Sequence, residues 1–330
     1  MFEIITFGSS TWDIYLKIEK DQVLKSDKVA SGTAVGFDLG AKIDIRDMYF
    51  SFGGGGVNAA HTFRNLGFDV AYCGSVGHDI PGKEIIAELE SRGVGTQFVQ
   101  KNEKPTNNSI ILLTPDNERT VLAYRGASED LNREEIMWGD MSPSWFYLAP
   151  LSGKLSDLTE DIVDFAKKNK IKVAINLGNS QILLGKEKLD PILKKVDVLL
   201  LNLEEASLLT GIDKKDEMGI MRELNSIHPG INTVTKGPEG VLVGEQDVLL
   251  EASACKVKIV DKTGAGDAFG SGFIAGLIKS NMDTEWAIRL GIANSSSCIR
   301  VRGAVNGLLE KVPDFTKTGE KIKIERKKII

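Results

Sequence analysis

Short hydrophobic runs alternate with segments of helical periodicity along most of the chain. Runs of apolar and β-branched residues, which are typical of strands, occupy residues 3–8, 69–77, 145–150, 172–178, 196–202 and 232–237. Most of these runs are hydrophobic at nearly every position, which indicates strands buried on both faces, as in a parallel sheet.

Helical periodicity is clear in residues 155–170. Leu155, Leu158, Ile162 and Phe165 recur there at intervals of three and four, which places them on one face of a helix. Other helices are expected to begin near Val57, Gly82, Glu204 and Asp216. Strands that alternate with helices in this way predict an α/β fold with a doubly wound, mostly parallel sheet.

Two parts of the chain interrupt this alternation. Apolar and polar residues alternate in 14–20 and 42–52, which is typical of strands with one solvent-exposed face, and residues 108–124 have the pattern of a hairpin. We therefore expect a core formed by 1–13, 51–104 and 126–330. Residues 14–50 and 105–125 are expected to form a small inserted β-sheet that acts as a lid.

Composition narrows the possible partners. The chain has 330 residues, of which 42% are hydrophobic, and its net charge of −5 gives no support for a nucleic-acid partner. Its three cysteines are widely spaced without a C-x-x-C pair, which argues against a disulfide framework or zinc site and favours a cytoplasmic location. No apolar run approaches the roughly 18 residues of a membrane span, so no membrane partner is expected.

The stretch "DKTGAGDAFGSGF", residues 261–273, combines glycines with carboxylates and leads into a helical pattern. It is not a P-loop, because the chain contains no G-x-x-x-x-G-K-[ST], and its glycines lack the G-x-G-x-x-G spacing of dinucleotide-binding folds. The N–H groups at the start of a helix bind anions, and glycines let the backbone approach a phosphate closely. We therefore expect Gly264, Ala265 and Gly266 to hold a phosphoryl group.

Asp267 follows in the first turn of the same expected helix. A carboxylate in this position can simply interact with the helix dipole. It can also act as a general base, removing the proton of a hydroxyl that attacks the phosphorus atom. The surrounding glycines favour the catalytic interpretation.

Three further stretches each leave two interpretations open. The glycines at 53–56 run into a helix that contains Asn58, and they form either a hinge or a backbone surface for a polyhydroxylated ligand. Asp13 either accepts hydrogen bonds from ligand hydroxyls or is an ordinary loop residue. Asn202 and Glu205 have the spacing of a helix capping box, which explains them without any ligand.

Taken together, these stretches resemble the ribokinase-like, or pfkB, family of carbohydrate and nucleoside kinases. The resemblance follows the chain in order through "FGSSTWD", "GGGGVNAA", "VGHDIPG", "NLEEASLLTG", "VTKGPEGV", "DKTGAGDAFGSGF" and "ANSSSCIRVRGA", and "TGAGDAF" is its most specific part. It implies a three-layer α/β/α domain with a small β-sheet lid. It also implies transfer of the γ-phosphoryl group of ATP to a hydroxyl of a small sugar.

The resemblance also implies roles for individual residues. Asp267 would be the general base, and the anion hole would consist of Gly264, Ala265 and Gly266. The substrate would be held by Asp13, Gly54, Gly55 and Asn58. ATP would be bound by Asn202, Thr235, Gly237 and Asn294. Mg²⁺ would be ordered through water by Asn202 and Glu205, and a monovalent cation such as K⁺ would lie beside Asp261 and Thr263.

Two other functions remain open at this point. A nucleoside kinase with the same chemistry is favoured by Phe37, Tyr49 and Phe50, since aromatic residues in the lid can stack on a base. A non-catalytic sugar sensor is opposed by Asp267, because a sensor has no need of a base.

Three departures from the family pattern leave the sugar undetermined. Lys262 stands where a small hydroxyl residue is usual, and Gly55 where ribokinases carry a lysine. The stretch "YLAPLSG" lacks the acid that ribokinases have near this strand.

The apolar faces of the expected lid strands need a partner. The core domain, a bound ligand or a second subunit would each supply one, and the last would give a homodimer through the lid.

Overall fold

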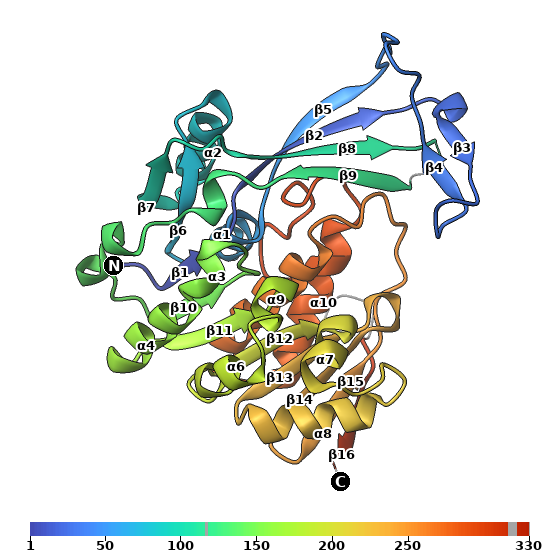
Figure 1. Ribbon diagram of the computed structural model, residues 1–330. Coiled ribbons are helices and arrows are strands. Elements are labelled where there is room, and N and C mark those ends of the chain that lie inside the picture. Colours follow the sequence, from blue (N-terminus) through green and yellow to red (C-terminus); the bar gives the residue numbers. More distant parts are fainter. Residues whose placement is uncertain (116–117, 316–321, 330) are drawn as a thin grey trace.

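The computed structural model describes residues 1–115, 118–315 and 322–329 (Figure 1). Its centre is a ten-stranded sheet. Across the sheet the strands are β7 (Gly95–Asn102), β6 (Val70–Gly77), β1 (Ile4–Phe7), β10 (Trp145–Leu148), β11 (Lys172–Asn176), β12 (Val198–Asn202), β13 (Ile231–Thr235), β14 (Val241–Glu245), β15 (Val248–Ala252) and β16 (Ile324–Lys328). The strands from β7 to β13 are parallel, whereas β14, β15 and β16 pair antiparallel.

Helices cover both faces of this sheet. One layer consists of α1 (Gly55–Asn65), α2 (Ile80–Ser91), α9 (Ala265–Lys279) and α10 (Thr284–Cys298). The other consists of α3 (Lys154–Asp157), α4 (Thr159–Lys168), α5 (Asn179–Ile182), α6 (Lys186–Leu193), α7 (Leu203–Thr210) and α8 (Glu217–Ile227). Neighbouring residues of β1 enter different cores, since Ile4 packs with the first layer and Ile5 with the second. Among the described residues, no helix is long and apolar enough to cross a membrane.

The fold class predicted from the sequence is confirmed, with differences in detail. The helix expected over 155–170 is two helices, α3 and α4, which meet at Leu158. The Thr159 hydroxyl donates to the Ser156 carbonyl, a local bond that competes with continuous helical pairing. In the alternating segment 42–52, strand structure begins only at Met48.

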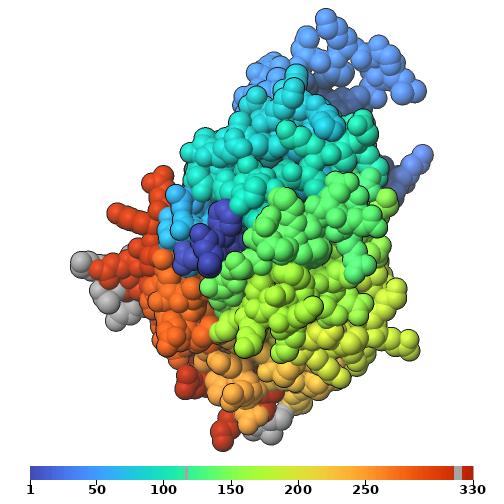
Figure 2. All heavy atoms as spheres, turned by 90° about the vertical axis from the view of Figure 1, so that its left-hand side faces the viewer, coloured from blue at the N-terminus to red at the C-terminus, as the bar shows by residue number. Residues whose placement is uncertain are grey.

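A second, smaller sheet lies across the end of the core where α9 begins (Figure 1). Its strand order is β5 (Met48–Gly53), β2 (Thr11–Lys17), β8 (Asn107–Leu113) and β9 (Arg119–Tyr124), and we call it the small sheet. The pairing of β2 with β8 is parallel and the other two pairings are antiparallel. A ribbon of β3 (Val23–Lys25) and β4 (Thr33–Val35) follows β2, and this blue part of the chain projects from the body of the protein in Figure 2.

Pairing in the small sheet places Asp13 and a row of apolar residues on opposite faces. Asp13 pairs with Ser51 on one side and Ser109 on the other, and directly paired residues share a face. One step along β2, Ile14 pairs with Phe50 and Ile110, so these apolar side chains lie on the opposite face. The face that carries Asp13 is directed toward the core.

Candidate active site

The N-terminus of α9 is built around Gly264. This residue is the N-cap and has a φ of 76°, a left-handed conformation that favours glycine. A Cβ atom at this position would also lie 2.5 Å from the Ala304 Cβ. The helix starts at Ala265, so Asp267 lies in its first turn, as the sequence predicted. The Ala265 N–H donates to the Lys262 carbonyl at 3.3 Å, whereas the next N–H groups have no carbonyl one turn earlier in the helix to bind. This arrangement can bind an anion.

Asp267 lies in the first turn of α9, and its side chain is oriented by α1. The Asn58 Nδ2 donates to Asp267 Oδ2 at 2.8 Å. Burial raises the pKa of Asp267, although the bond from Asn58 acts in the opposite direction. A Cβ atom at Gly55 would lie 2.9 Å from the Ala149 Cβ and 3.4 Å from Asp267 Oδ1, so a glycine here lets the loop pack closely against Ala149 and beside the second carboxylate oxygen. A half-buried carboxylate with one free side can accept a proton from a hydroxyl group.

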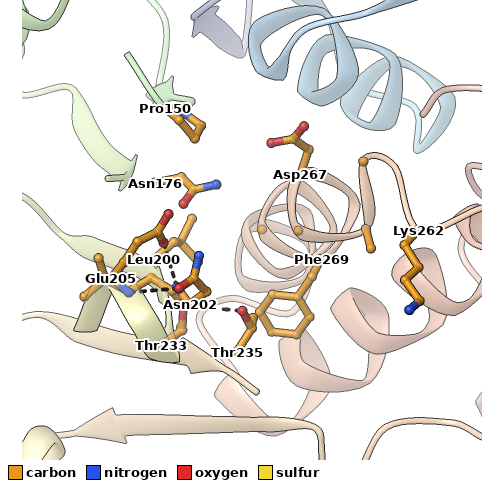
Figure 3. A pocket seen from close by; sticks show the side chains of 15 residues that line it. Pro150, Asn176, Leu200, Asn202, Glu205, Thr233, Thr235, Lys262, Asp267 and Phe269 are labelled. Carbon is orange, nitrogen blue, oxygen red and sulfur yellow. Dashed lines mark hydrogen bonds between the residues drawn. The ribbon is translucent and has the colours of Figure 1, made fainter. Parts of the chain in front are cut away.

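A pocket of about 230 Å³ opens beside these residues (Figure 3). The carboxyl ends of β11, β12 and β13 and the start of α9 contribute its lining, which consists of Pro150, Asn176, Leu200, Leu201, Asn202, Glu205, Thr233, Thr235, Lys262, Gly264, Ala265, Gly266, Asp267, Phe269 and Gly270. Ligands of doubly wound folds bind at this edge of the sheet. In Figure 3, Lys262 extends away from the Asp267 carboxylate.

Asn176 lines the pocket but belongs to none of the motifs identified in the sequence. It is the last residue of β11. The available signal was a polar residue at the carboxyl end of a buried strand, the same signal that marks Asn202 on the neighbouring strand.

Asn202 and Glu205 form the capping box that their spacing indicates. The Glu205 backbone N–H donates to Asn202 Oδ1 at 2.9 Å, and the Asn202 backbone N–H donates to Glu205 Oε2 at 2.8 Å. Both residues also line the pocket, and burial raises the pKa of Glu205. Capping and a role toward a ligand are therefore compatible here.

The other residues expected to bind the nucleotide do not all lie at the pocket. Thr235 lines the pocket, but Gly237 and Asn294 are not part of its lining. Asn294 is fully buried, and its Nδ2 donates to the Ala268 carbonyl at 2.8 Å while its Oδ1 accepts from the Leu309 N–H at 2.9 Å. These bonds give Asn294 a structural role that ties α10 to α9.

Asp13 lies on the other side of the glycine stretch. Its side chain is only 5% exposed, and burial raises its pKa to about 6, although a hydrogen bond from Ser109 lowers it. Gly53 packs so closely on the Asp13 carboxylate that a Cβ atom there would overlap it, while Gly55 lies against Asp267. The glycine stretch thus runs between the two carboxylates, and Gly54 adopts a φ of 92° within it.

Asp261 and Thr263 lie immediately before the N-cap of α9. Asp261 Oδ1 accepts from the Thr263 N–H at 2.9 Å and from the Thr263 hydroxyl at 2.7 Å. It also accepts from Arg119 Nη1 at 2.9 Å. Sequence reasoning missed Arg119, because it is 142 residues away and only the docking of β9 brings it to this loop.

Similarity to known proteins extends over most of the chain. The sequence model of the pfkB family carbohydrate kinases matches residues 27–311. A ribokinase from Haemophilus influenzae is 28% identical over 275 residues, which are 82% of this chain and 88% of that protein.

Solved structures show the same fold. A ribokinase from Arabidopsis thaliana, complexed with ribose and ATP, superposes with a TM-score of 0.74 at 23% identity and covers 94% of this chain and 99% of its own. A nucleoside kinase from Methanocaldococcus jannaschii superposes with a TM-score of 0.73 at 20% identity and covers 93% of this chain and 94% of its own.

The chain therefore belongs to the pfkB family of carbohydrate kinases. It is a phosphotransferase that acts on a hydroxyl group.

Proposed function

We propose that this protein transfers the γ-phosphoryl group of ATP to a hydroxyl of a small free sugar. The observation that carries the proposal is the placement of two carboxylates, Asp13 and Asp267, against opposite ends of one glycine stretch. One carboxylate serves substrate binding and the other serves proton removal.

On the phosphoryl side, the residues of α9 carry the chemistry. Bound ATP supplies the phosphoryl group. The backbone at Gly264, Ala265 and Gly266 provides N–H donors for its oxygens, where negative charge develops during transfer. Asp267 removes the proton of the attacking hydroxyl. Asn58 donates a hydrogen bond to Asp267 Oδ2, so that Asp267 Oδ1, which lies beside Gly55, is left to accept this proton.

On the acceptor side, the small sheet binds the sugar and acts as a lid. Asp13 accepts hydrogen bonds from ring hydroxyls, since a carboxylate is an acceptor and a sugar offers adjacent donors. Ser51 and Ser109 lie beside it in the same row and add hydroxyl groups that both donate and accept. Gly54 and Gly55 let the backbone turn closely beside the sugar, since Gly54 has a φ of 92°, and closure of the lid excludes water from the transfer.

A nucleoside is the less favoured acceptor because the aromatic residues expected to stack on its base are placed elsewhere. Tyr49 stacks on Tyr15 with ring centroids 4.4 Å apart, and the Arg302 guanidinium lies over the Tyr49 ring at 5.3 Å. The Tyr49 ring is thus packed against groups of the protein itself. Phe50 is on the outer face of the small sheet and 50% exposed, and Phe37 is 46% exposed.

Asn202 and Glu205 are proposed to position Mg²⁺ through water. Mg²⁺ usually keeps several waters and binds to one or two carboxylates together with substrate phosphates. The half-buried Glu205 carboxylate beside the pocket fits such a site. Thr235 is proposed to lie along the nucleotide. Gly237 and Asn294 are not retained in this proposal, because neither lines the pocket.

The test is a phosphate-acceptor screen with Mg-ATP. Free pentoses, free hexoses, nucleosides and sugar phosphates are compared by the kcat/KM of ADP release, with Asp267→Asn as the control for contaminating kinases. We expect a free sugar to give the highest kcat/KM. A nucleoside or sugar phosphate in first place would overturn the choice of acceptor, and no turnover with any acceptor would overturn the proposal as a whole.

We further propose that the outer face of the small sheet packs against the same face of a second copy. Its exposed apolar residues include Met48, Phe50, Ile110 and Leu122, and a symmetric dimer buries one patch against itself. Phe50→Glu should shift the sedimentation coefficient from dimer to monomer. Ile80→Glu is the matched control, because Ile80 is 73% exposed on α2, outside the small sheet. A monomeric wild type would contradict the proposal.

A further inference from the structure

The loop before α9 does not fit the monovalent cation that the family resemblance implies. A carboxylate offers about four lone-pair sites for hydrogen bonds. Asp261 already accepts five, since Oδ2 binds the Tyr15 hydroxyl at 3.1 Å and the Gly303 N–H at 3.0 Å in addition to the three bonds to Oδ1. The carboxylate is therefore saturated by protein donors.

Arg119 is the cation at this place. Its Nη1 donates to Asp261 Oδ1 at 2.9 Å and to Thr263 Oγ1 at 2.7 Å, so one nitrogen bridges both residues that were expected to face the ion. The Asp261 side chain is 6% exposed and that of Arg119 is 35% exposed. A guanidinium remains charged at every physiological pH, and its donors have a fixed geometry.

The Asp261 carboxylate is held in its charged form. Burial acts to raise its pKa, but hydrogen bonds from Thr263, Gly303 and Tyr15 outweigh burial, and the pKa of Asp261 is lowered. The ion pair with Arg119 is thus maintained across the neutral pH range.

Arg119 belongs to the small sheet, whereas its partners belong to the core. It is the first residue of β9, an edge strand of the small sheet. Thr263 directly precedes Gly264, the N-cap of α9. Tyr15 on β2 makes a second contact from the small sheet to the same carboxylate. The position of the small sheet is therefore linked directly to the loop that presents the anion-binding N–H groups.

We propose that Arg119 is a built-in cation, which takes the place of a monovalent metal ion and positions the anion-hole loop when the small sheet is docked. This proposal rests on the proposed kinase function, since it assigns a positioning residue to that reaction. It makes phosphoryl transfer independent of K⁺. It also makes ordering of the loop depend on docking of the small sheet.

The test compares wild type, Arg119→Met and Arg119→Lys in KCl, NaCl and choline chloride at equal ionic strength. Wild type should show the same kcat and the same Tm in all three salts. Arg119→Met should lose about 10-fold in kcat in choline, less than the 10²–10³ that follows loss of a direct oxyanion donor. K⁺ or guanidinium ion should restore part of this loss, and Arg119→Lys should keep most of the activity without an added ion.

The matched control is Arg125→Met. Arg125 follows β9 and pairs with Glu129 at 3.7 Å, and its side chain is 61% exposed. This variant should behave like wild type in every salt. Activation of wild type by K⁺ over choline would overturn the proposal, and so would an Arg119→Met variant whose kcat and Tm are the same in KCl and choline.

Melting also separates this proposal from the proposed function. The Tm of Arg119→Met should rise in KCl relative to choline, whereas the Tm of wild type should not change. This comparison needs no substrate. If no acceptor is phosphorylated, the kinase proposal fails, and the melting data still decide whether Arg119 occupies a cation site.

Discussion

The two sides of the proposed active site are built in different ways. The phosphoryl side is one continuous stretch, from Asp261 through the first turn of α9. The acceptor side is assembled from Asp13, Ser51 and Ser109, which come from three strands of the small sheet. The backbone of the first is local to the core, although Arg119 and Tyr15 of the small sheet bind its Asp261. The second exists only when distant strands pair.

Because of this difference, the residues proposed for phosphoryl transfer and those proposed to select the substrate lie in different parts of the protein. A helix N-terminus with a carboxylate in its first turn serves phosphoryl transfer to any hydroxyl held in place. In the proposed site, the row on the small sheet determines which hydroxyl compound is held. Changes on the phosphoryl side should therefore act mainly on kcat, and changes on the acceptor side mainly on the KM for the sugar.

Asp267→Asn should have the largest effect. The amide cannot accept the proton, so kcat should fall by about 10²–10⁴-fold. The Kd for ATP, measured by calorimetry, should stay the same, because the backbone of α9 is unchanged. A turnover near that of wild type would exclude Asp267 as the base.

Asp13→Ala tests the acceptor side. Hydrogen bonds to a charged group contribute about 1.5–3 kcal/mol, so the KM for the sugar should rise by about 10- to 100-fold. The KM for ATP should change little. Ser109→Ala, in the same row, should give a smaller rise because its hydroxyl is uncharged. An equal rise in both KM values for Asp13→Ala would contradict a division of the site into two sides.

The same difference explains what the sequence could predict. The phosphoryl side was readable because Gly264 and Asp267 are neighbours in the chain and open a helix. On the acceptor side, Asp13 was recognised, but its row with Ser51 and Ser109 depends on strand register, which local patterns do not determine. Arg119 was missed for the same reason. Asn294 is the opposite case, because its motif was visible in the sequence, but only the structure shows that its amide bonds to Ala268 and Leu309.

The pKa of Asp13 gives a third test. Since that pKa is about 6, the KM for the sugar in wild type should rise as pH falls through 6, where the carboxylate becomes protonated. In Asp13→Asn the KM should be high and should not rise further over the same range. A wild-type KM that is constant between neutral pH and pH 5 would place the substrate away from Asp13.

Asp13 should also lower the stability of the free protein at neutral pH. Its pKa is raised from 3.8 to about 6 in the folded state, so the folded protein binds more protons than the unfolded chain between these values. The cost of the charged form is fully present above pH 6 and disappears below 3.8. Asp13→Asn should therefore increase the free energy of unfolding by about 1–3 kcal/mol at neutral pH and by little in acid.

Substitution of Glu205 should have the smallest effect on stability. Two variants separate its capping function from its proposed function in positioning Mg²⁺. Glutamine can still accept from the Asn202 N–H, so Glu205→Gln keeps the capping box but removes the charge. Glu205→Ala removes both and should lower the free energy of unfolding by about 0.5–2 kcal/mol. If Glu205 positions Mg²⁺, both variants should need more Mg²⁺ for half-maximal activity. If it only caps α7, Glu205→Gln should match wild type in a Mg²⁺ titration, and the proposed metal role would be withdrawn.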